Sequence, residues 1–264
     1  MPKALWGISR VPARPPKHDD FGMHNATKTH PAPTPNFQRP RPEPFGGAKK
    51  DGESILGPYE RAFVQKWVDK VPRRVETFHL TMLTVVWSLG LLVFGYLAAG
   101  DLRWLFAVSA MVIGQYLTDL FDGAVGRHRN TGLVKWGFFM DHFLDFVFAG
   151  CFVIAYSFLA PNMMFWFLGL LLTTGATMAL SFLNFAATNK FQIAYHGIGP
   201  TEIRIAYVAI NTIVFFSGAA VLSWAVPFLL VGNIVGLVVM ANGTHKKLWA
   251  IDMAANHTAT KHDA

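Results

Sequence analysis

The sequence predicts an all-α integral membrane protein, with six transmembrane helices preceded by an interfacial amphipathic helix and a disordered N-terminal tail. The first observation behind this prediction is composition. Hydrophobic residues make up 52% of the 264-residue chain and charged residues only 15%, against about 25% charged in an average soluble domain. The second observation is a series of long apolar runs, each near the ~20 residues that a helix needs to cross a bilayer.

Residues 1–57 are expected to form a disordered, Pro-rich cytoplasmic tail. They contain ten of the fifteen prolines in the chain, and such a segment buries too little apolar surface to offset the entropy lost on ordering. A passive tail is favoured over one that binds a partner in a polyproline conformation. No signal peptide is expected, because the first 30 residues are polar and rich in Pro and Lys.

Residues 58–72 are expected to form an amphipathic helix, because Pro58 suits a first helical turn. Large apolar residues then recur every four positions, at Tyr59, Phe63, Trp67 and Val71. Such a stripe is typical of a helix that lies in the membrane interface, with an ordinary core-facing helix as the alternative. The apolar segments that follow favour the interface.

Six apolar segments lie within residues 73–243, and each is long enough to span a bilayer. They cover approximately residues 79–99, 102–120, 137–159, 162–188, 202–221 and 223–240. Residues 244–264 are expected to form a polar cytoplasmic C-terminal tail.

Basic residues in the short loops predict the orientation, because cytoplasmic loops are enriched in Lys and Arg. One side of the predicted bundle carries only Arg103. The other side carries eight basic residues, namely Arg73, Arg74, Arg127, Arg129, Lys135, Lys190, Lys246 and Lys247. Both termini are expected on that cytoplasmic side. The net charge of +7 favours contact with anionic lipid headgroups, and no basic recognition helix or base-stacking motif points to nucleic acid.

The most informative cluster in the sequence is acidic. Four of the six acids between residues 78 and 243 fall within 27 residues, namely Asp119, Asp122, Asp141 and Asp145. Acids within membrane spans are costly and usually functional. Spacings of three and four residues place each pair on one face of its helix, and the short connection predicts that the two helices are antiparallel neighbours. Four carboxylates are then expected to face one another at the cytoplasmic boundary.

Four such carboxylates would repel one another strongly, so the cluster predicts one or two bound divalent cations. All-oxygen ligands suit Mg²⁺ or Mn²⁺, and carboxylate-bound Mg²⁺ usually also holds substrate phosphates. Gly123 leaves room for a ligand to approach the backbone, and Arg127 offers a guanidinium that can pair with a phosphate. The sequence therefore predicts a metal site for phosphoryl transfer.

Residues 119–145 resemble the signature of the CDP-alcohol phosphotransferase family, Asp-x2-Asp-Gly-x2-Ala-Arg-x8/9-Gly-x3-Asp-x3-Asp. Seven of its eight fixed positions match, at Asp119, Asp122, Gly123, Arg127, Gly137, Asp141 and Asp145. The departure is Gly126, where the family pattern has Ala. Motif and six-span layout together cover residues 58 to about 243, so residues 73–243 are expected to form the catalytic membrane domain.

The resemblance implies a reaction in which an alcohol attacks the phosphorus of a CDP-linked alcohol and CMP is released. In the family, two divalent metals hold the CDP pyrophosphate, and the motif positions assign four metal ligands, Asp119, Asp122, Asp141 and Asp145. The last motif aspartate is the proposed general base, which gives Asp145 that second role. The motif also implies that Gly123, Gly126 and Arg127 border the CDP moiety.

A weaker signal lies on the same predicted side as the aspartates, at His196, Glu202 and Arg204. These three residues are candidates for recognition of the acceptor or headgroup. The Thr201-Glu202 pair is similar to one that follows the fourth span of some choline and ethanolamine phosphotransferases. The alternative is a helix N-terminus, with Thr201 as the cap and Glu202 complementing the helix dipole.

Three functions stay open at this point. The first is an enzyme of phospholipid biosynthesis that transfers a phosphatidyl group from CDP-diacylglycerol to a small polar alcohol. The second uses CDP-choline or CDP-ethanolamine with diacylglycerol as acceptor. The third, a divalent-cation transporter or non-catalytic binding protein, is disfavoured because the acids cluster at one end of two spans and no internal repeat is visible. The family often forms homodimers, so a homodimer is one expected assembly.

Overall fold

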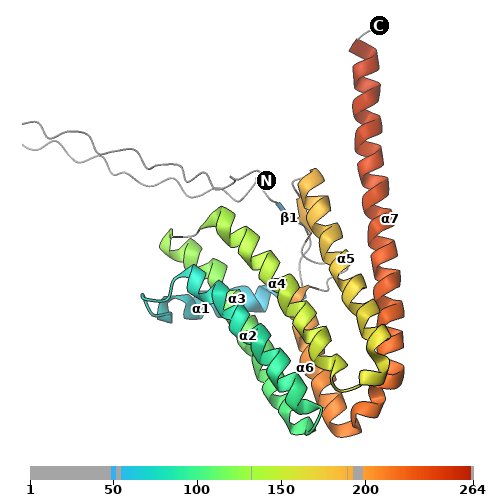
Figure 1. Cartoon of the computed structure of the whole chain (residues 1–264). Helices are drawn as coiled ribbons and strands as arrows, with labels where there is room; N and C mark the ends of the chain where they lie inside the picture. Colours follow the sequence, from blue (N-terminus) through green and yellow to red (C-terminus); the bar gives the residue numbers. More distant parts are fainter. Residues whose placement is uncertain (1–48, 52–54, 132, 189, 193–198, 263–264) are drawn as a thin grey trace, which may run out of the picture. The chain divides into compact units, whose positions relative to one another are not determined.

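The computed structural model describes residues 49–51, 55–131, 133–188, 190–192 and 199–262, so most of the tail expected at residues 1–57 lies outside the described residues. The described chain is almost entirely helical, as the sequence predicts (Figure 1). Its α-helices are α1 (Gly57–Trp67), α2 (Thr77–Ala98), α3 (Leu105–Arg129), α4 (Val134–Ser157), α5 (Met164–Thr188), α6 (Pro200–Ser217) and α7 (Leu222–His262). Four short 3-10 turns join them, at Val68–Lys70, Leu102–Trp104, Pro161–Met163 and Ala219–Val221.

In the part of the chain that the structure describes, two three-residue strands accompany the helices. Strand β1 (Lys49–Asp51) pairs in parallel with β2 (Lys190–Gln192), and Lys50 lies opposite Phe191. The pairing joins the chain just before α1 to the chain just after α5. β1 lies inside the segment expected to be a disordered tail, and so short a strand has no periodicity that would reveal it in the sequence.

Within the described residues, five helical segments are long and apolar enough to cross a membrane, namely Thr77–Ala98, Leu102–Arg129, Val134–Ser157, Pro161–Thr188 and Ala219–Ala254. They correspond to five of the six expected spans. The expected span at residues 202–221 corresponds to α6, which is not among the five. Its 18 residues include Glu202, Arg204 and Asn211, and these polar side chains lower its mean hydropathy.

Helix α2 is central to this part of the bundle, because it packs against both α3 and α4. The contact with α4 is very close at Gly95, where an added Cβ would lie 2.5 Å from the Cβ of Ala155. Close crossings at small residues are typical of membrane helices. The backbones of α3 and α4 do not pack closely on each other, and the two helices meet through side chains such as Gln115 and Asp145. Polar side chains of the candidate site lie between them.

Helix α3 continues to Arg129, well past the end of the span expected at residues 102–120. Gly123, Gly126 and Arg127 therefore lie in the last turns of a helix rather than in a loop. The helix ends at Asn130, whose φ of 54° is in the left-handed region. Asn is one of the few residues that adopt this conformation readily, and it commonly terminates helices.

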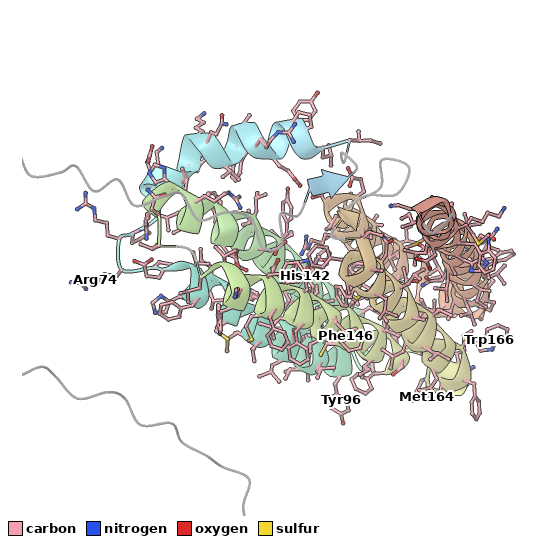
Figure 2. The ribbon with its side chains drawn as sticks, turned by 90° about the horizontal axis from the view of Figure 1, so that it is seen from above. Arg74, Tyr96, His142, Phe146, Met164 and Trp166 are labelled. Atoms are coloured by element: carbon pink, nitrogen blue, oxygen red, sulfur yellow. The ribbon has the colours of Figure 1, made fainter. Side chains whose placement is uncertain are left out.

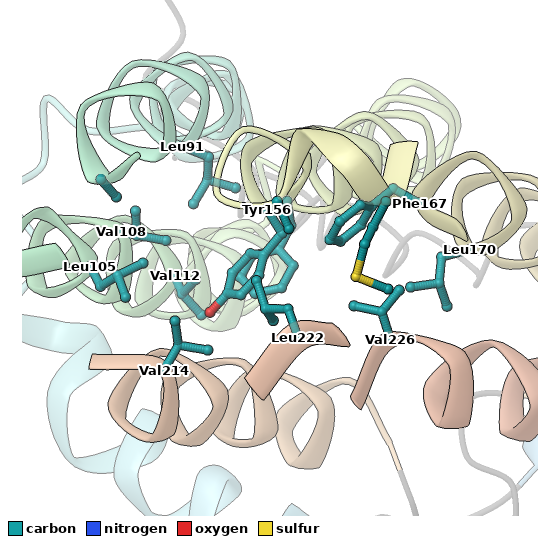
Figure 3. Packing of buried hydrophobic residues seen from close by; sticks show 14 of the residues in the cluster. Leu91, Leu105, Val108, Val112, Tyr156, Phe167, Leu170, Val214, Leu222 and Val226 are labelled. Atoms are coloured by element: carbon teal, nitrogen blue, oxygen red, sulfur yellow. The ribbon is translucent and has the colours of Figure 1, made fainter. Parts of the chain in front are cut away.

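Buried contacts hold the polar helix α6 in the bundle. Val214 of α6 is 1% exposed and packs in one hydrophobic cluster with Val108 of α3 and Tyr156 of α4 (Figure 3). The Tyr156 hydroxyl donates to the side-chain oxygen of Asn211, and the Asn211 amide donates to the Ser109 hydroxyl at 2.8 Å. Because buried polar groups are held by their partners, these bonds fix the rotation of α6 about its axis.

Val64 of helix α1 and Val68 of the 3-10 turn that follows it pack with Ala124 and Val125 at the end of α3. The aromatic stripe found in the sequence is largely exposed, at 74% for Tyr59, 41% for Phe63 and 41% for Trp67. Seen from above, α1 lies along one side of the helices α3 and α4 (Figure 2). Helix and 3-10 turn together end at Lys70, two residues before the boundary expected at residue 72.

Helix α7 is 41 residues long and passes through the span expected at residues 223–240. It continues as a helix to His262, so most of the expected C-terminal tail is helical.

At the opposite end of α3 from the aspartates, Arg103 pairs with Asp101 at 2.7 Å. The hydrogen bonds that Asp101 accepts from Arg103 hold the pKa of this carboxyl below its usual range.

Candidate metal centre

Three of the four motif aspartates converge on one point between α3 and α4. One carboxylate oxygen each from Asp119, Asp141 and Asp145 lie within 4.8 Å of one another. Oxygen ligands lie about 2.0–2.1 Å from Mg²⁺, so two ligands of one ion lie at most about 4.2 Å apart. The three carboxylates are thus close enough to converge on one ion if their side chains move closer together.

The fourth motif aspartate, Asp122, is 8% exposed and is not part of that group of three. The Thr81 hydroxyl donates to its Oδ2 at 2.6 Å, and the Thr77 hydroxyl donates to its main-chain carbonyl at 3.1 Å. Both threonines come from the first turns of α2. These bonds fix the orientation of Asp122 and leave Oδ1 as the oxygen that it can offer to a ligand.

Arg204 brings a positive charge into the aspartate cluster from α6. Its Nη2 lies 2.8 Å from Asp119 Oδ2 and 3.4 Å from Asp145 Oδ1, and the residue is only 9% exposed. The sequence suggested Arg204 only as a candidate for recognition of the acceptor. The structure places it between two of the proposed metal ligands.

Gln115 is a member of the site that the sequence analysis missed. It is completely buried on α3, one turn before Asp119. Its Nε2 donates to Asp145 Oδ1 at 3.0 Å, and its Oε1 accepts from Arg204 Nε at 2.7 Å. One side chain thus connects α3, α4 and α6 at the cluster. A glutamine inside an apolar span, four residues before a motif aspartate, is the sequence signal that was available.

The residues expected to border the CDP moiety lie on the last turns of α3. The exposed Arg127 folds back over Gly123, where an added Cβ would lie 3.0 Å from Arg127 Nη1. Gly126 is buried within the helix. On α4, an added Cβ at Gly137 would meet no atom within 4 Å. Since Gly137 lies one turn before Asp141, open space borders the aspartate cluster there.

Glu202 forms hydrogen bonds at the start of α6. It accepts a hydrogen bond from the backbone N–H of Gly199 at 2.8 Å, across the first turn. It also accepts from the backbone N–H of Leu56 at 3.1 Å, which ties α6 to the start of α1. Gly199 is the N-cap of the helix, so the cap is not Thr201. His196 lies outside the described residues.

Glu60 on α1 accepts hydrogen bonds from two helices that carry the site. The Tyr116 hydroxyl of α3 donates to Glu60 Oε1 at 3.1 Å, and the Thr201 hydroxyl of α6 donates to the same oxygen. The guanidinium carbon of Arg204 lies 5.9 Å from the centre of the Tyr116 ring. Glu60 therefore fastens α1 to the two helices that position Arg204.

Five apolar helices and a carboxylate cluster on two of them define an integral membrane protein with an acidic site that could bind metal. The family model of CDP-alcohol phosphatidyltransferase matches residues 79–239, more than half of the chain. The chain therefore belongs to the CDP-alcohol phosphatidyltransferase family. This is a family of transferases of phospholipid synthesis that use divalent metals, which confirms the resemblance seen in the motif. A comparison with curated proteins gave no match.

Proposed function

We propose that this protein is a metal-dependent CDP-alcohol phosphotransferase that transfers a phosphatidyl group from CDP-diacylglycerol to a small polar alcohol, with release of CMP. The observation that carries this proposal is the convergence of Asp119, Asp141 and Asp145, whose carboxylate oxygens lie within 4.8 Å of one another. These aspartates lie in helices long enough to cross the membrane, so a lipid can enter from the bilayer and a polar acceptor from water.

The donor set fits hard divalent cations, because it consists of carboxylate oxygens alone. We assign two ions, Mg²⁺ or Mn²⁺, to the four motif aspartates Asp119, Asp122, Asp141 and Asp145. When bound, such ions neutralise the negative charge of the pyrophosphate and stabilise the charge that develops during transfer. In this assignment Asp122 would contribute Oδ1, because Thr81 holds its Oδ2 at 2.6 Å.

Asp145 acts as the general base in the proposed reaction. It accepts the proton of the acceptor hydroxyl as that oxygen attacks the phosphorus attached to diacylglycerol. A new P–O bond forms, the bond between this phosphorus and the CMP oxygen breaks, and CMP leaves with the bonding electrons. Gln115 donates to Asp145 Oδ1 at 3.0 Å, which leaves Oδ2 as the oxygen that takes the proton.

The CDP moiety is assigned to Gly123, Gly126 and Arg127 on the last turns of α3. Arg127 is exposed, so its guanidinium can leave Gly123 and pair with a phosphate through two parallel hydrogen bonds. The open space beside Gly137, where an added Cβ meets no atom within 4 Å, gives the pyrophosphate a place next to the aspartates.

The second candidate function transfers phosphocholine or phosphoethanolamine from its CDP derivative to diacylglycerol. It rests on the Thr201-Glu202 pair, which is similar to one in such enzymes. In the structure the Thr201 hydroxyl bonds Glu60, and Glu202 bonds the backbone at Gly199. Because both side chains are engaged in holding the start of α6, we favour CDP-diacylglycerol as the donor.

We further propose that α6 is a sixth span, that α1 lies in the membrane interface, and that both termini and the aspartates face the cytoplasm. The exposed aromatic stripe of α1 supports an interfacial position, and the basic loops support the orientation. Cysteines introduced at Arg74 and Arg103, in a variant with Cys151 replaced by Ser, test this. A membrane-impermeant thiol reagent added to inverted vesicles should label position 74 and leave position 103 unlabelled. The opposite pattern would refute the orientation.

Purified protein tests the reaction directly. With Mg²⁺, CDP-diacylglycerol and a set of small polar alcohols, CMP should form with at least one acceptor, and EDTA should abolish its formation. CMP release from CDP-choline or CDP-ethanolamine with diacylglycerol alone would establish the second function instead. If no donor–acceptor pair gave CMP, while the protein still moved divalent ions across vesicle membranes, both enzyme functions would be refuted and the protein would be a transporter.

A further inference from the structure

The charges around the proposed metal site do not balance in the protein alone. The four motif aspartates supply four carboxylates, and one buried guanidinium, that of Arg204, contacts two of them. Ionised together, these five groups leave a formal net charge of minus three. Buried like charges within a few ångströms repel one another strongly, so the position of this one cation matters for the whole cluster.

Arg204 contacts two of the three carboxylates that a bound metal ion would need. Its Nη2 lies 2.8 Å from Asp119 Oδ2 and 3.4 Å from Asp145 Oδ1. Asp119 and Asp145 also belong to the group of three whose oxygens lie within 4.8 Å of one another. A divalent ion at this point and the guanidinium in its present place would both be cations competing for the same two carboxylates.

A neutral side chain holds Arg204 in this place. Gln115 is fully buried, accepts from Arg204 Nε at 2.7 Å and donates to Asp145 Oδ1 at 3.0 Å. The amide thus aims the Nη2 end of the guanidinium at the carboxylates. The fixed rotation of α6 contributes as well, because Asn211, two turns after Arg204, is bonded to Ser109 at 2.8 Å.

We propose that Arg204 is a built-in counter-cation that competes with divalent ions for Asp119 and Asp145, and that Gln115 holds it in the competing position. This inference rests on the proposed metal site. With Arg204 in place, one divalent ion brings the formal charge to minus one and a second brings it to plus one. The second ion is therefore favoured only once the anionic pyrophosphate has arrived, which couples metal occupancy to the nucleotide substrate.

Binding of Mn²⁺ to the purified protein, without any substrate, tests this inference. The concentration of free Mn²⁺ is measured by electron paramagnetic resonance during a titration. Arg204→Gln removes the charge and keeps a polar side chain, Arg204→Lys keeps the charge, and Gln115→Met removes both amide hydrogen bonds. Arg103→Gln, at the other end of the bundle, controls for the change in net charge.

Arg204→Gln should bind the first Mn²⁺ about tenfold or more tightly, because a buried positive charge within a few ångströms opposes a divalent ion. Gln115→Met should bind it about threefold more tightly, and Arg204→Lys and Arg103→Gln should resemble the wild type. Mn²⁺ should also raise the thermal midpoint of Arg204→Gln by more than it raises that of the wild type.

Unchanged or weaker Mn²⁺ binding by Arg204→Gln would overturn the inference, provided that the variant elutes as the wild type does and Asp119→Asn reduces binding. If Arg204→Gln failed to fold, unchanged binding by Gln115→Met would overturn it in the same way. Absence of Mn²⁺ binding by the wild type itself would refute the metal site, and the inference with it. The two failures are thus distinguishable.

Discussion

The Thr81 hydroxyl donates a 2.6 Å hydrogen bond to Oδ2 of Asp122, and both residues are buried, at 3% and 8% exposure. The same hydroxyl oxygen also lies 3.1 Å from the carbonyl oxygen of Thr77, one turn earlier in α2. A motif aspartate on α3 is therefore oriented by a residue 41 positions earlier in the chain. Outer partners of this kind commonly tune the ligands of a metal site.

Thr81→Val should reduce CMP formation about 10- to 100-fold, because Asp122 loses the donor that fixes its free oxygen. The change keeps the volume of the side chain, so the cost in stability should be about 1 kcal/mol. CMP release and the thermal midpoint measure the two effects. Thr173→Val is the matched control, since the hydroxyl of this buried residue bonds carbonyls of its own helix. Equal activity of Thr81→Val and wild type would show that Thr81 has no role in orienting Asp122.

Asp145→Asn should lower the rate of CMP formation by about 10² to 10⁴, because an amide cannot accept the hydroxyl proton. Because Asp145 is also a proposed metal ligand, the rate is measured at saturating Mg²⁺ and CDP-linked substrate, where the loss of the base lowers kcat. Full activity of this variant would exclude Asp145 as the base. Asp101→Asn is the control, because Asp101 pairs with Arg103 at the opposite end of α3 and should leave the rate unchanged.

Gly137→Ala should leave the thermal midpoint unchanged or slightly raised, because the methyl group meets no atom within 4 Å and Ala favours helix over Gly by about 0.5–1 kcal/mol. It should nevertheless raise KM for the CDP-linked substrate, since the methyl group enters the space assigned to the pyrophosphate. Gly232→Ala, on α7 with equally open surroundings, should change only stability. An unchanged KM in Gly137→Ala would show that the pyrophosphate does not bind at the start of α4.

Glu60→Ala should loosen α1, because this carboxylate accepts from both Tyr116 and Thr201. Hydrogen exchange of residues 57–70 should become faster. CMP formation should fall a few-fold, because Tyr116 lies against Arg204. Lys66→Ala, at an exposed position of the same helix, should change neither. If exchange rose and activity stayed constant, α1 would have no part in positioning the site.

The arrangement of the site depends on contacts that cross between helices. Helical periodicity pairs Asp141 with Asp145, and the motif links them to Asp119, so the sequence alone identified the aspartates. Periodicity is a local property, however, and says nothing about which helix faces them. Arg204 lies 85 positions after Asp119 in the chain, and only the packing of α6 against α3 brings its guanidinium to 2.8 Å from that carboxylate.

The sequence by itself determined the membrane class, five of the long apolar helices, the family and the positions of the motif aspartates. Composition, the length of the apolar segments and the spacing of the motif residues are properties of the sequence that do not depend on the fold. The tertiary structure decided that α2 packs against both α3 and α4, that Thr81 holds Asp122, and that Gln115 and Arg204 complete the cluster. The physical reason is that buried polar side chains take whichever partner the helix packing brings within hydrogen-bond distance. Helix rotation and crossing positions, such as the close contact at Gly95, set those distances.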